Sequence, residues 1–311
     1  MKKTKKKVEL SPAARKKRRN EYFFMGVFLA FPIVNFFIFY AFANFNSILM
    51  AFQRPAYGGS ENYIWTFENF KRIVEMLGSG ESGNLLEAAR NTFLFWAVGI
   101  VITLPITVLA CYFFYVKIPG YKFYRAIMYL PHIIASSALV VLFKYAVGYG
   151  GPLDALADKL GKTFTYPLAV APSAIITILI YHVAFGLGGN IVVISGAMHG
   201  INAEMLESAR IDGCNWFQEL TKIILPAIRP TISTMILLSV VGIMNATGPI
   251  LAFTQGDAGT MTLSFYIYKL VAGIGSGSND LNLAAALGIV MTIASAPLVF
   301  IVKHIIDKKE D

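Results

Sequence analysis

The side chains best suited to metal binding or nucleophilic chemistry are few and scattered. The chain has two cysteines, Cys111 and Cys214, and four histidines at positions 132, 182, 199 and 304. None of these stands at the short, repeated spacing that a metal site requires. No P-loop, H-E-x-x-H or G-x-S-x-G motif occurs. The sequence therefore predicts no metal site and no catalytic residues, and we expect the chain not to be an enzyme.

One stretch is polar in an otherwise apolar part of the chain. It runs ESARIDGCNWFQELTKIILP, from Glu207 to Pro226. The residues from 203 to 219 suit a short helix, and Glu207 precedes Arg210 at the i,i+3 spacing of an ion pair. Asp212-Gly213 is expected to break that helix. A second amphipathic helix is expected to place on one face Trp216, Phe217, Leu220, Ile223 and Ile224.

The rest of the sequence sets the environment of this stretch. Hydrophobic residues make up 56% of the 311 residues and charged residues only 14%, against about 25% charged in soluble domains. Six runs contain no Asp, Glu, Lys or Arg: 22–53, 91–116, 126–143, 163–203, 230–256 and 281–302. Each can hold the roughly 17–25 apolar residues of a membrane span. The predicted fold is an all-α integral membrane protein with six transmembrane helices, the run 163–203 being one long span interrupted by glycines.

The distribution of basic residues predicts the orientation. With the N-terminus inside, the segments on the cytoplasmic side hold 19 of the 27 Lys and Arg, ten of them in residues 1–21. Both termini are therefore predicted to be cytoplasmic. The basic N-terminus is interpreted as an orientation signal rather than a nucleic-acid arm, a lipid tether or a cleaved signal peptide. This divides the chain into a tail (1–21), a membrane domain (22–306) and a second tail (307–311), with the polar loop (about 204–226) facing the cytoplasm.

The polar loop resembles the EAA loop of permease subunits in bacterial binding-protein-dependent ABC importers. That motif reads E-A-A, three residues, Gly, nine residues and I-x-L-P. Here Glu207-Ser208-Ala209, Gly213 and Ile223-Ile224-Leu225-Pro226 stand at the same spacing, with serine for the second-position alanine. The segments FENFKRIV, NTFLFW and GYKFYRAIMYLPHII are similar to the carbohydrate-importer branch, of the maltose and glycerol-phosphate type.

The resemblance implies partners and roles. It implies a multi-pass subunit of the bacterial cytoplasmic membrane, paired with a second homologous permease, two cytoplasmic ATPases and an extracellular solute-binding protein. ATP and Mg²⁺ would be used by the ATPases, and no cofactor is expected in this chain. The loop would be the coupling helix, with the ATPase contact formed by Glu207, Ser208, Ala209, Asp212, Gly213 and Cys214. Membrane lipid is an expected partner and nucleic acid is not. The second permease is expected to differ from this chain, although a homodimer stays open.

Polar and aromatic groups within the spans are candidates for the substrate path. Carbohydrate recognition needs a few placed polar groups in apolar walls. The candidates are Tyr181, His182 and Asn190 in the fourth span, and Asn245, Thr247 and Phe253 in the fifth. Each has an alternative role in helix packing. Two other functions stay open, namely an ABC importer of a non-sugar solute and an ion-coupled secondary carrier. The near absence of ionisable groups in the spans disfavours the carrier.

Overall fold

A computed structural model describes residues 12–55, 63–78, 83–243, 249–274 and 280–307. Within these ranges the regular secondary structure is helical apart from one antiparallel hairpin, β1 (Gln53–Pro55) paired with β2 (Tyr63–Trp65). The prediction of a helical membrane fold is confirmed, and the hairpin is an addition that the sequence analysis did not anticipate.

Four helices of the described part are long and apolar enough to cross a membrane: Asn20–Ala51, Leu85–Tyr115, Ser173–His199 and Leu281–His304. Two further pairs pass the same test only when joined. Tyr121–Ile133 meets Ser136–Lys159 at 106°, and Trp216–Ala227 meets Arg229–Gly242 at 69°. Prolines lie close to both bends, since Pro131 precedes the first and Pro226 and Pro230 flank the second. A proline removes a backbone donor and disfavours the α conformation before it, so these two segments are not straight helices.

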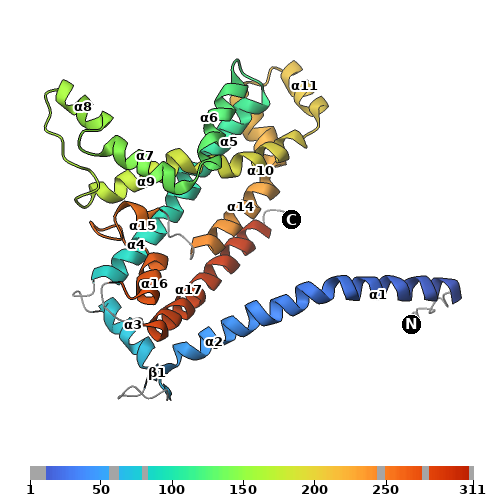
Figure 1. The fold of residues 1–311 in the computed structure, drawn as a ribbon. Helices are drawn as coiled ribbons and strands as arrows, with labels where there is room; N and C mark the ends of the chain where they lie inside the picture. Colours follow the sequence, from blue (N-terminus) through green and yellow to red (C-terminus); the bar gives the residue numbers. More distant parts are fainter. Residues whose placement is uncertain (1–11, 56–62, 79–82, 244–248, 275–279, 308–311) are drawn as a thin grey trace.

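The first span is a single long helix built from α1 (Pro12–Asn35), the π-helical turn η1 (Phe36–Ala41) and α2 (Phe42–Ala51). No part of its apolar window is buried in the chain. It extends away from the other helices and meets them only at the α2 end (Figure 1). There α2 packs on α17 (Leu281–Asp307). The first span is thus held at one end and open along its length.

Two buried amides fix that end. Asn282 donates to the carbonyl oxygens of Met50 and Gln53, at 2.9 and 2.8 Å. Asn69, in α3 (Glu68–Gly78), donates to those of Ala51 and Gln53, at 3.0 and 2.9 Å. The last carbonyls of a helix lack partners within the helix, so these amides satisfy groups that would otherwise be unpaired. Span one, α3 and α17 are joined at this point.

The central helices are the second and fourth candidate spans. The second consists of α4 (Gly83–Val98), the π-turn η3 (Gly99–Thr103) and α5 (Leu104–Tyr115), and the fourth of α9 (Ser173–Gly186) and α10 (Gly188–His199). As expected, the helix breaks beside the glycines at 186–189, at Leu187, and the two helices together form one candidate span over Ser173–His199. Gly188 also allows close contact with α6 (Tyr121–Ile133), because a Cβ atom there would lie 2.9 Å from the His132 Cβ.

The remaining helices complete the body. They are α7 (Ser136–Val147), α8 (Pro152–Lys159), α11 (Ala203–Ile211), α12 (Trp216–Gln218), the π-turn η4 (Glu219–Ile224), α13 (Leu225–Ala227), α14 (Arg229–Gly242), α15 (Ile250–Phe253) and α16 (Leu263–Ala272). Figure 1 shows α11 at the opposite end of the body from β1 and α3. An apolar cluster that includes Tyr112, Met198 and Ile224 lies beside α11. A second cluster, including Phe95 and Phe265, lies among α4, α7, α9 and α16.

Two of the π-turns stand directly before a proline. The Leu104 N–H bonds to the Gly99 carbonyl ahead of Pro105, and the Leu225 N–H bonds to the Leu220 carbonyl ahead of Pro226. These i→i−5 bonds widen the turn where a proline ring would clash with an α-helical carbonyl. Each extra residue rotates the following side chains around the helix relative to an ideal α-helix.

Candidate functional site

The polar loop begins with α11, whose end is set by backbone hydrogen bonds. Gly213 has φ +82°, the left-handed conformation that favours glycine. The Cys214 N–H donates to the Ala209 carbonyl at 3.0 Å, and the Gly213 N–H to the Arg210 carbonyl at 3.1 Å. This pair of bonds is a Schellman motif. The predicted helix break at Asp212-Gly213 is therefore confirmed, with α11 ending at Ile211.

A new helix starts immediately after this break. Asn215 accepts from the Gln218 N–H at 2.9 Å, and the Gln218 side chain accepts from the Asn215 N–H at 3.0 Å. This capping box fixes the start of α12. The chain then continues through η4 and α13 to the bend at Ile228 and into α14. The loop is thus two capped helices joined by a short turn.

The predicted single apolar face of this second helix is wrong in part. Leu220 and Ile224 are buried, whereas Trp216 and Phe217 are 56% and 58% exposed. The cause is the π-turn from 219 to 224, which rotates the later residues away from the α-helical positions assumed for them. Trp216 and Phe217 thus remain on the surface near Gly213.

Arg210 joins the two halves of the loop. Its Nε and Nη2 donate to Oε2 and Oε1 of Glu219, each at 2.9 Å. The Glu219 side chain is 4% exposed and that of Arg210 49%. The expected pairing of Arg210 with Glu207 is replaced by this two-bond contact, because the turn at Gly213 brings η4 back alongside α11. The bonds to the Glu219 carboxylate raise the pKa of Arg210 above its ordinary value.

The predicted contact residues occupy the outer face of this loop. Glu207, Ser208, Asp212 and Gly213 are exposed, and Ala209 and Cys214 are partly buried. Leu206 is the buried residue of α11, packed into the cluster with Tyr112. The loop therefore exposes these residues, while Leu206 packs α11 on the body and Arg210 ties α11 to Glu219.

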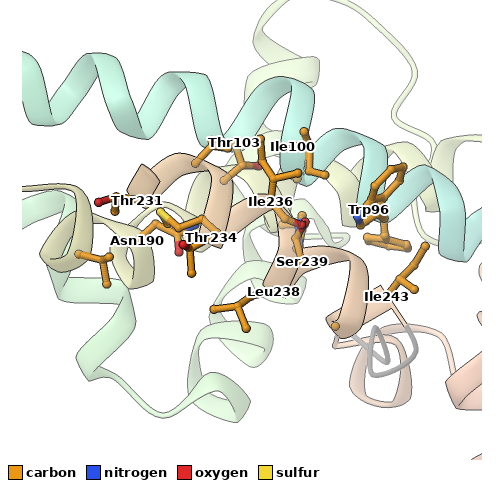
Figure 2. Close-up of a pocket in the computed structure, with 18 residues that line it drawn as sticks. Trp96, Ile100, Thr103, Asn190, Thr231, Thr234, Ile236, Leu238, Ser239 and Ile243 are labelled. Carbon is orange, nitrogen blue, oxygen red and sulfur yellow. The ribbon is translucent and has the colours of Figure 1, made fainter. Parts of the chain in front are cut away.

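A cavity of about 680 Å³ lies between the second, fourth and fifth candidate spans. Figure 2 shows Trp96 toward one side of it and Asn190 and Thr231 toward the other. Its walls come from α4, η3, α5, α9, α10 and α14, and no Asp, Glu, Lys or Arg lines it among the residues that the structure describes. Sites of this volume, apolar with a few polar groups, are typical of small-molecule binding.

Two polar atoms at this cavity have no hydrogen-bond partner among the described residues. They are the Trp96 Nε1–H and the Thr103 hydroxyl. The hydroxyls of Thr234 and Ser239 already donate to backbone carbonyls, at 2.9 and 2.6 Å. Buried polar groups are almost always paired. Both of these atoms are covered by neighbouring atoms in this conformation, so a ligand would reach them only after a local rearrangement of the cavity wall.

The candidate substrate residues separate into three groups. His182 and Asn190 line the cavity, and His182 also makes an edge contact with Phe95 at 5.6 Å between ring centroids. Tyr181 and Phe253 do not line it. They are buried and pack on one another at 5.0 Å, beside Phe143 and Phe185. Asn245 and Thr247 lie outside the described residues.

Sequence reasoning missed Trp96 and Thr103. Both lie in the second span, which contributed no candidate. The available signal was a pair of hydrogen-bonding side chains seven residues apart, close to two helical turns, in a run without charges. It also missed the Asn215–Gln218 capping box, although N-x-x-Q before an apolar stretch is a recognisable start signal.

No group of three or more His, Cys, Asp or Glu side chains that could hold a metal ion occurs in the described part of the chain. Cys111 is buried and Cys214 is partly buried, and they lie apart from one another as free thiols.

Comparison with known proteins identifies the family to which this chain belongs. A family model described as "Binding-protein-dependent transport system inner membrane component" matches residues 82–310, and the chain belongs to this family. It is therefore a multi-pass protein of the cytoplasmic membrane.

Individual relatives are similar over most of the chain. "Multiple sugar-binding transport system permease protein MsmF" of Streptococcus mutans is 25% identical over 269 residues, covering 86% of this chain and 89% of that protein. "Diacetylchitobiose uptake system permease protein NgcF" of Streptomyces coelicolor is 25% identical, covering 94% and 86%. A solved bacterial ABC transporter involved in import of the acidic polysaccharide alginate has the same fold, with a TM-score of 0.79, 21% identity and coverage of 94% of this chain and 98% of that chain.

Proposed function

We propose that this chain is a permease subunit of an ATP-driven importer that carries a sugar or oligosaccharide, delivered by an extracellular binding protein, across the cytoplasmic membrane. The observation that carries the proposal is the cavity itself, whose described lining is apolar with a few polar side chains and contains no Asp, Glu, Lys or Arg. Sugars present neutral hydroxyls and apolar ring faces, which such walls can bind. The relatives named for sugar and diacetylchitobiose uptake support the substrate class.

The proposed topology has six spans, with each bent pair counted as one, and both termini in the cytoplasm. The excess of Lys and Arg in residues 1–21 and in the other cytoplasmic segments supports this orientation. The proposed membrane domain covers 22–306, with tails at 1–21 and 307–311. The polar loop at about 204–226 then faces the cytoplasm, where an ATPase can reach it.

The proposed assembly contains this chain, a second and different permease, two ATPases that use ATP and Mg²⁺, and the binding protein. The unburied first span supports a second permease, because its length offers a surface to another membrane protein as well as to lipid. A solved relative of the same fold was found in complex with a periplasmic protein bound to alginate pentasaccharide, which supports the binding protein. This chain itself supplies no catalytic group.

In the proposed mechanism the ATPase contacts Glu207, Ser208, Ala209, Asp212, Gly213 and Cys214. Closure of the two ATPases on ATP would move this loop and switch the cavity between the two sides of the membrane. The small side chains at 208, 209 and 213 permit close approach of another backbone, and the Glu207 carboxylate is exposed for pairing with a basic group. The walls of the path would include Trp96, Thr103, His182 and Asn190.

Charge reversal at Glu207 tests the ATPase contact. In the Glu207→Arg variant, the ATPase is expected to be lost from complexes purified in mild detergent from native membranes. The exposed carboxylate that would pair with a basic group of the ATPase is replaced by a guanidinium, which repels that group. The control is Asp158→Arg, an exposed reversal on α8, which should keep the ATPase. A wild-type chain that purifies alone and still transports sugar in vesicles without ATP would contradict the proposed function.

Removing the Thr103 hydroxyl tests the substrate path. Since this hydroxyl has no described partner, Thr103→Val is expected to leave the unfolding temperature unchanged or slightly higher. Loss of one ligand hydrogen bond, worth about 0.5–1.5 kcal/mol, should raise the KM for sugar uptake roughly two- to tenfold.

The matched control for that variant is Thr107→Val in the same span. The Thr107 hydroxyl donates to the Thr103 carbonyl at 2.8 Å and does not line the cavity. This change should lower stability slightly and leave the KM unchanged. An unchanged KM in Thr103→Val, or an equal rise in both variants, would remove Thr103 from the path.

A further inference from the structure

Helix α11 has two neighbours in the chain that could follow its movement. It connects to α10 through residues 200–202, and to η4 and span five through residues 212–218. Movement of the loop could therefore reach the cavity through the fourth span or through the fifth. Both spans line the cavity, so the connection to α11 decides between them.

Apolar packing does not distinguish the two routes. Leu206 of α11 is buried in a cluster that contains Met198 from α10 as well as Leu220 and Ile224 from η4. It contacts a surface shared by both spans. The short link to α10 consists of Gly200, Ile201 and Asn202. Its side-chain bond is local, because Asn202 Oδ1 accepts from the Glu204 N–H of α11 at 3.0 Å.

The polar contacts do distinguish them. Arg210 of α11 and Glu219 at the start of η4 share two parallel hydrogen bonds of 2.9 Å. Two such bonds between a planar guanidinium and a carboxylate fix orientation as well as distance. The carboxylate is almost completely buried, so water cannot readily replace the guanidinium. The Schellman motif and the capping box hold the turn between them.

From Glu219 the chain runs without a gap into the cavity wall. η4 passes into α13, the chain bends at Ile228, and α14 follows. α14 contributes Thr231, Thr234 and Ser239 to the cavity. Nothing in the proposed ATPase contact includes Arg210 or Glu219, so their part is to position the loop relative to span five.

We propose that the Arg210–Glu219 pair makes α11 and the cytoplasmic end of span five move as one body, so that movement of the loop reaches the cavity through the fifth span. This inference rests on the proposed function. Arg210 and Glu219 are positioning residues. Their loss should separate ATP hydrolysis from transport without releasing the ATPase.

The first test uses the complete assembly purified from native membranes and placed in vesicles. The variants are Arg210→Gln, Glu219→Gln and the double change, with Lys122→Gln as an exposed single-charge control on the same side of the membrane. We expect all of them to keep the ATPase and basal ATP hydrolysis. Sugar imported per ATP should fall at least tenfold in the three pair variants and stay unchanged in the control. In Arg210→Lys, which keeps the charge but not the two-bond geometry, the sugar imported per ATP should lie between the values for Arg210→Gln and the wild-type chain.

The double change makes the result specific. If the two residues act only through each other, the double variant should be no worse than the worse single variant. Unchanged sugar import per ATP in both single variants would overturn the inference. If no ATPase accompanies even the wild-type chain, the proposed function itself fails, which is a separate outcome.

A second test follows the movement directly and does not depend on transport rates. Both native cysteines are first replaced, by Cys111→Ala and Cys214→Ala. One pair of spin labels, at Met205 and Lys222, then reports the distance between α11 and η4. A second pair, at Met205 and Gly196, reports the distance between α11 and α10. On trapping with ATP and vanadate, the 205–222 distance should stay fixed and the 205–196 distance should change. In Arg210→Gln the 205–222 distances should spread. The reverse pattern in the wild-type chain would overturn the inference.

Discussion

Gly213→Val is expected to reduce ATP-driven sugar uptake at least tenfold while leaving the helices of this chain folded. Gly213 has φ +82°, and a side chain there would meet nothing within 4 Å. The penalty is therefore one of backbone conformation and not of crowding. A left-handed conformation costs an ordinary residue about 1–2 kcal/mol, and β-branched valine tolerates it least. Because about 1.4 kcal/mol is a factor of ten, relief of that strain should open the Schellman turn and displace the proposed ATPase contact.

The matched control is Gly213→Asn at the same position. Asparagine adopts the left-handed region far more readily than valine, so it should retain most of the uptake. Uptake and ATPase co-purification would be measured together in both variants. Equal loss in the two would mean that the absence of a side chain, and not the left-handed turn, is what this position requires.

Gly188→Ala is expected to destabilise the chain by about 1–3 kcal/mol, the usual cost of overpacking. The new Cβ would lie 2.9 Å from the His132 Cβ and 3.0 Å from the Met128 carbonyl oxygen. Both belong to α6, and the carbonyl is backbone, so the helices must separate. Close helix contact through small residues is a main source of stability between membrane helices. The measurement is the unfolding midpoint in mixed micelles, followed by the helical circular dichroism signal.

Gly196→Ala is the control in the same helix. A Cβ there would meet nothing within 4 Å, so alanine should be neutral or stabilising by about 0.5–1 kcal/mol, the helix-propensity difference. If Gly188→Ala proved as stable as Gly196→Ala, the contact between α6 and α10 would not limit stability.

Part of this fold follows from local sequence. Charge-free runs identified the apolar segments, because the cost of burying charge in lipid acts on each segment independently. Gly213 identified the end of α11 because the left-handed position is a property of one residue. The glycines at 186–189 were harder to interpret, since their effect depends on α6, which lies elsewhere in the sequence.

The remainder depends on contacts between distant segments. Arg210 has a nearer carboxylate in sequence than Glu219, and only the turn at Gly213 decides which one it binds. Trp96 and Thr103 each have a buried polar atom without a described partner, which no single segment reveals. The bend after Pro131 and the π-turn before Pro226 also changed which side chains share a face. Tyr181 and Phe253 pack in the interior, while the neighbouring His182 lines the cavity.

The hydrogen bonds from the Asn282 side chain to the end of the first span determine when that span gains its partner during synthesis. Asn282 follows Met50 by 232 residues, and the helix that packs along α2 is α17. At about 5–20 residues per second, the ribosome needs on the order of 10–50 s to make that helix after the first one enters the membrane. During that interval the earliest helix lacks its main partner from its own chain. The final architecture around it is completed only as the last helix leaves the translocation machinery.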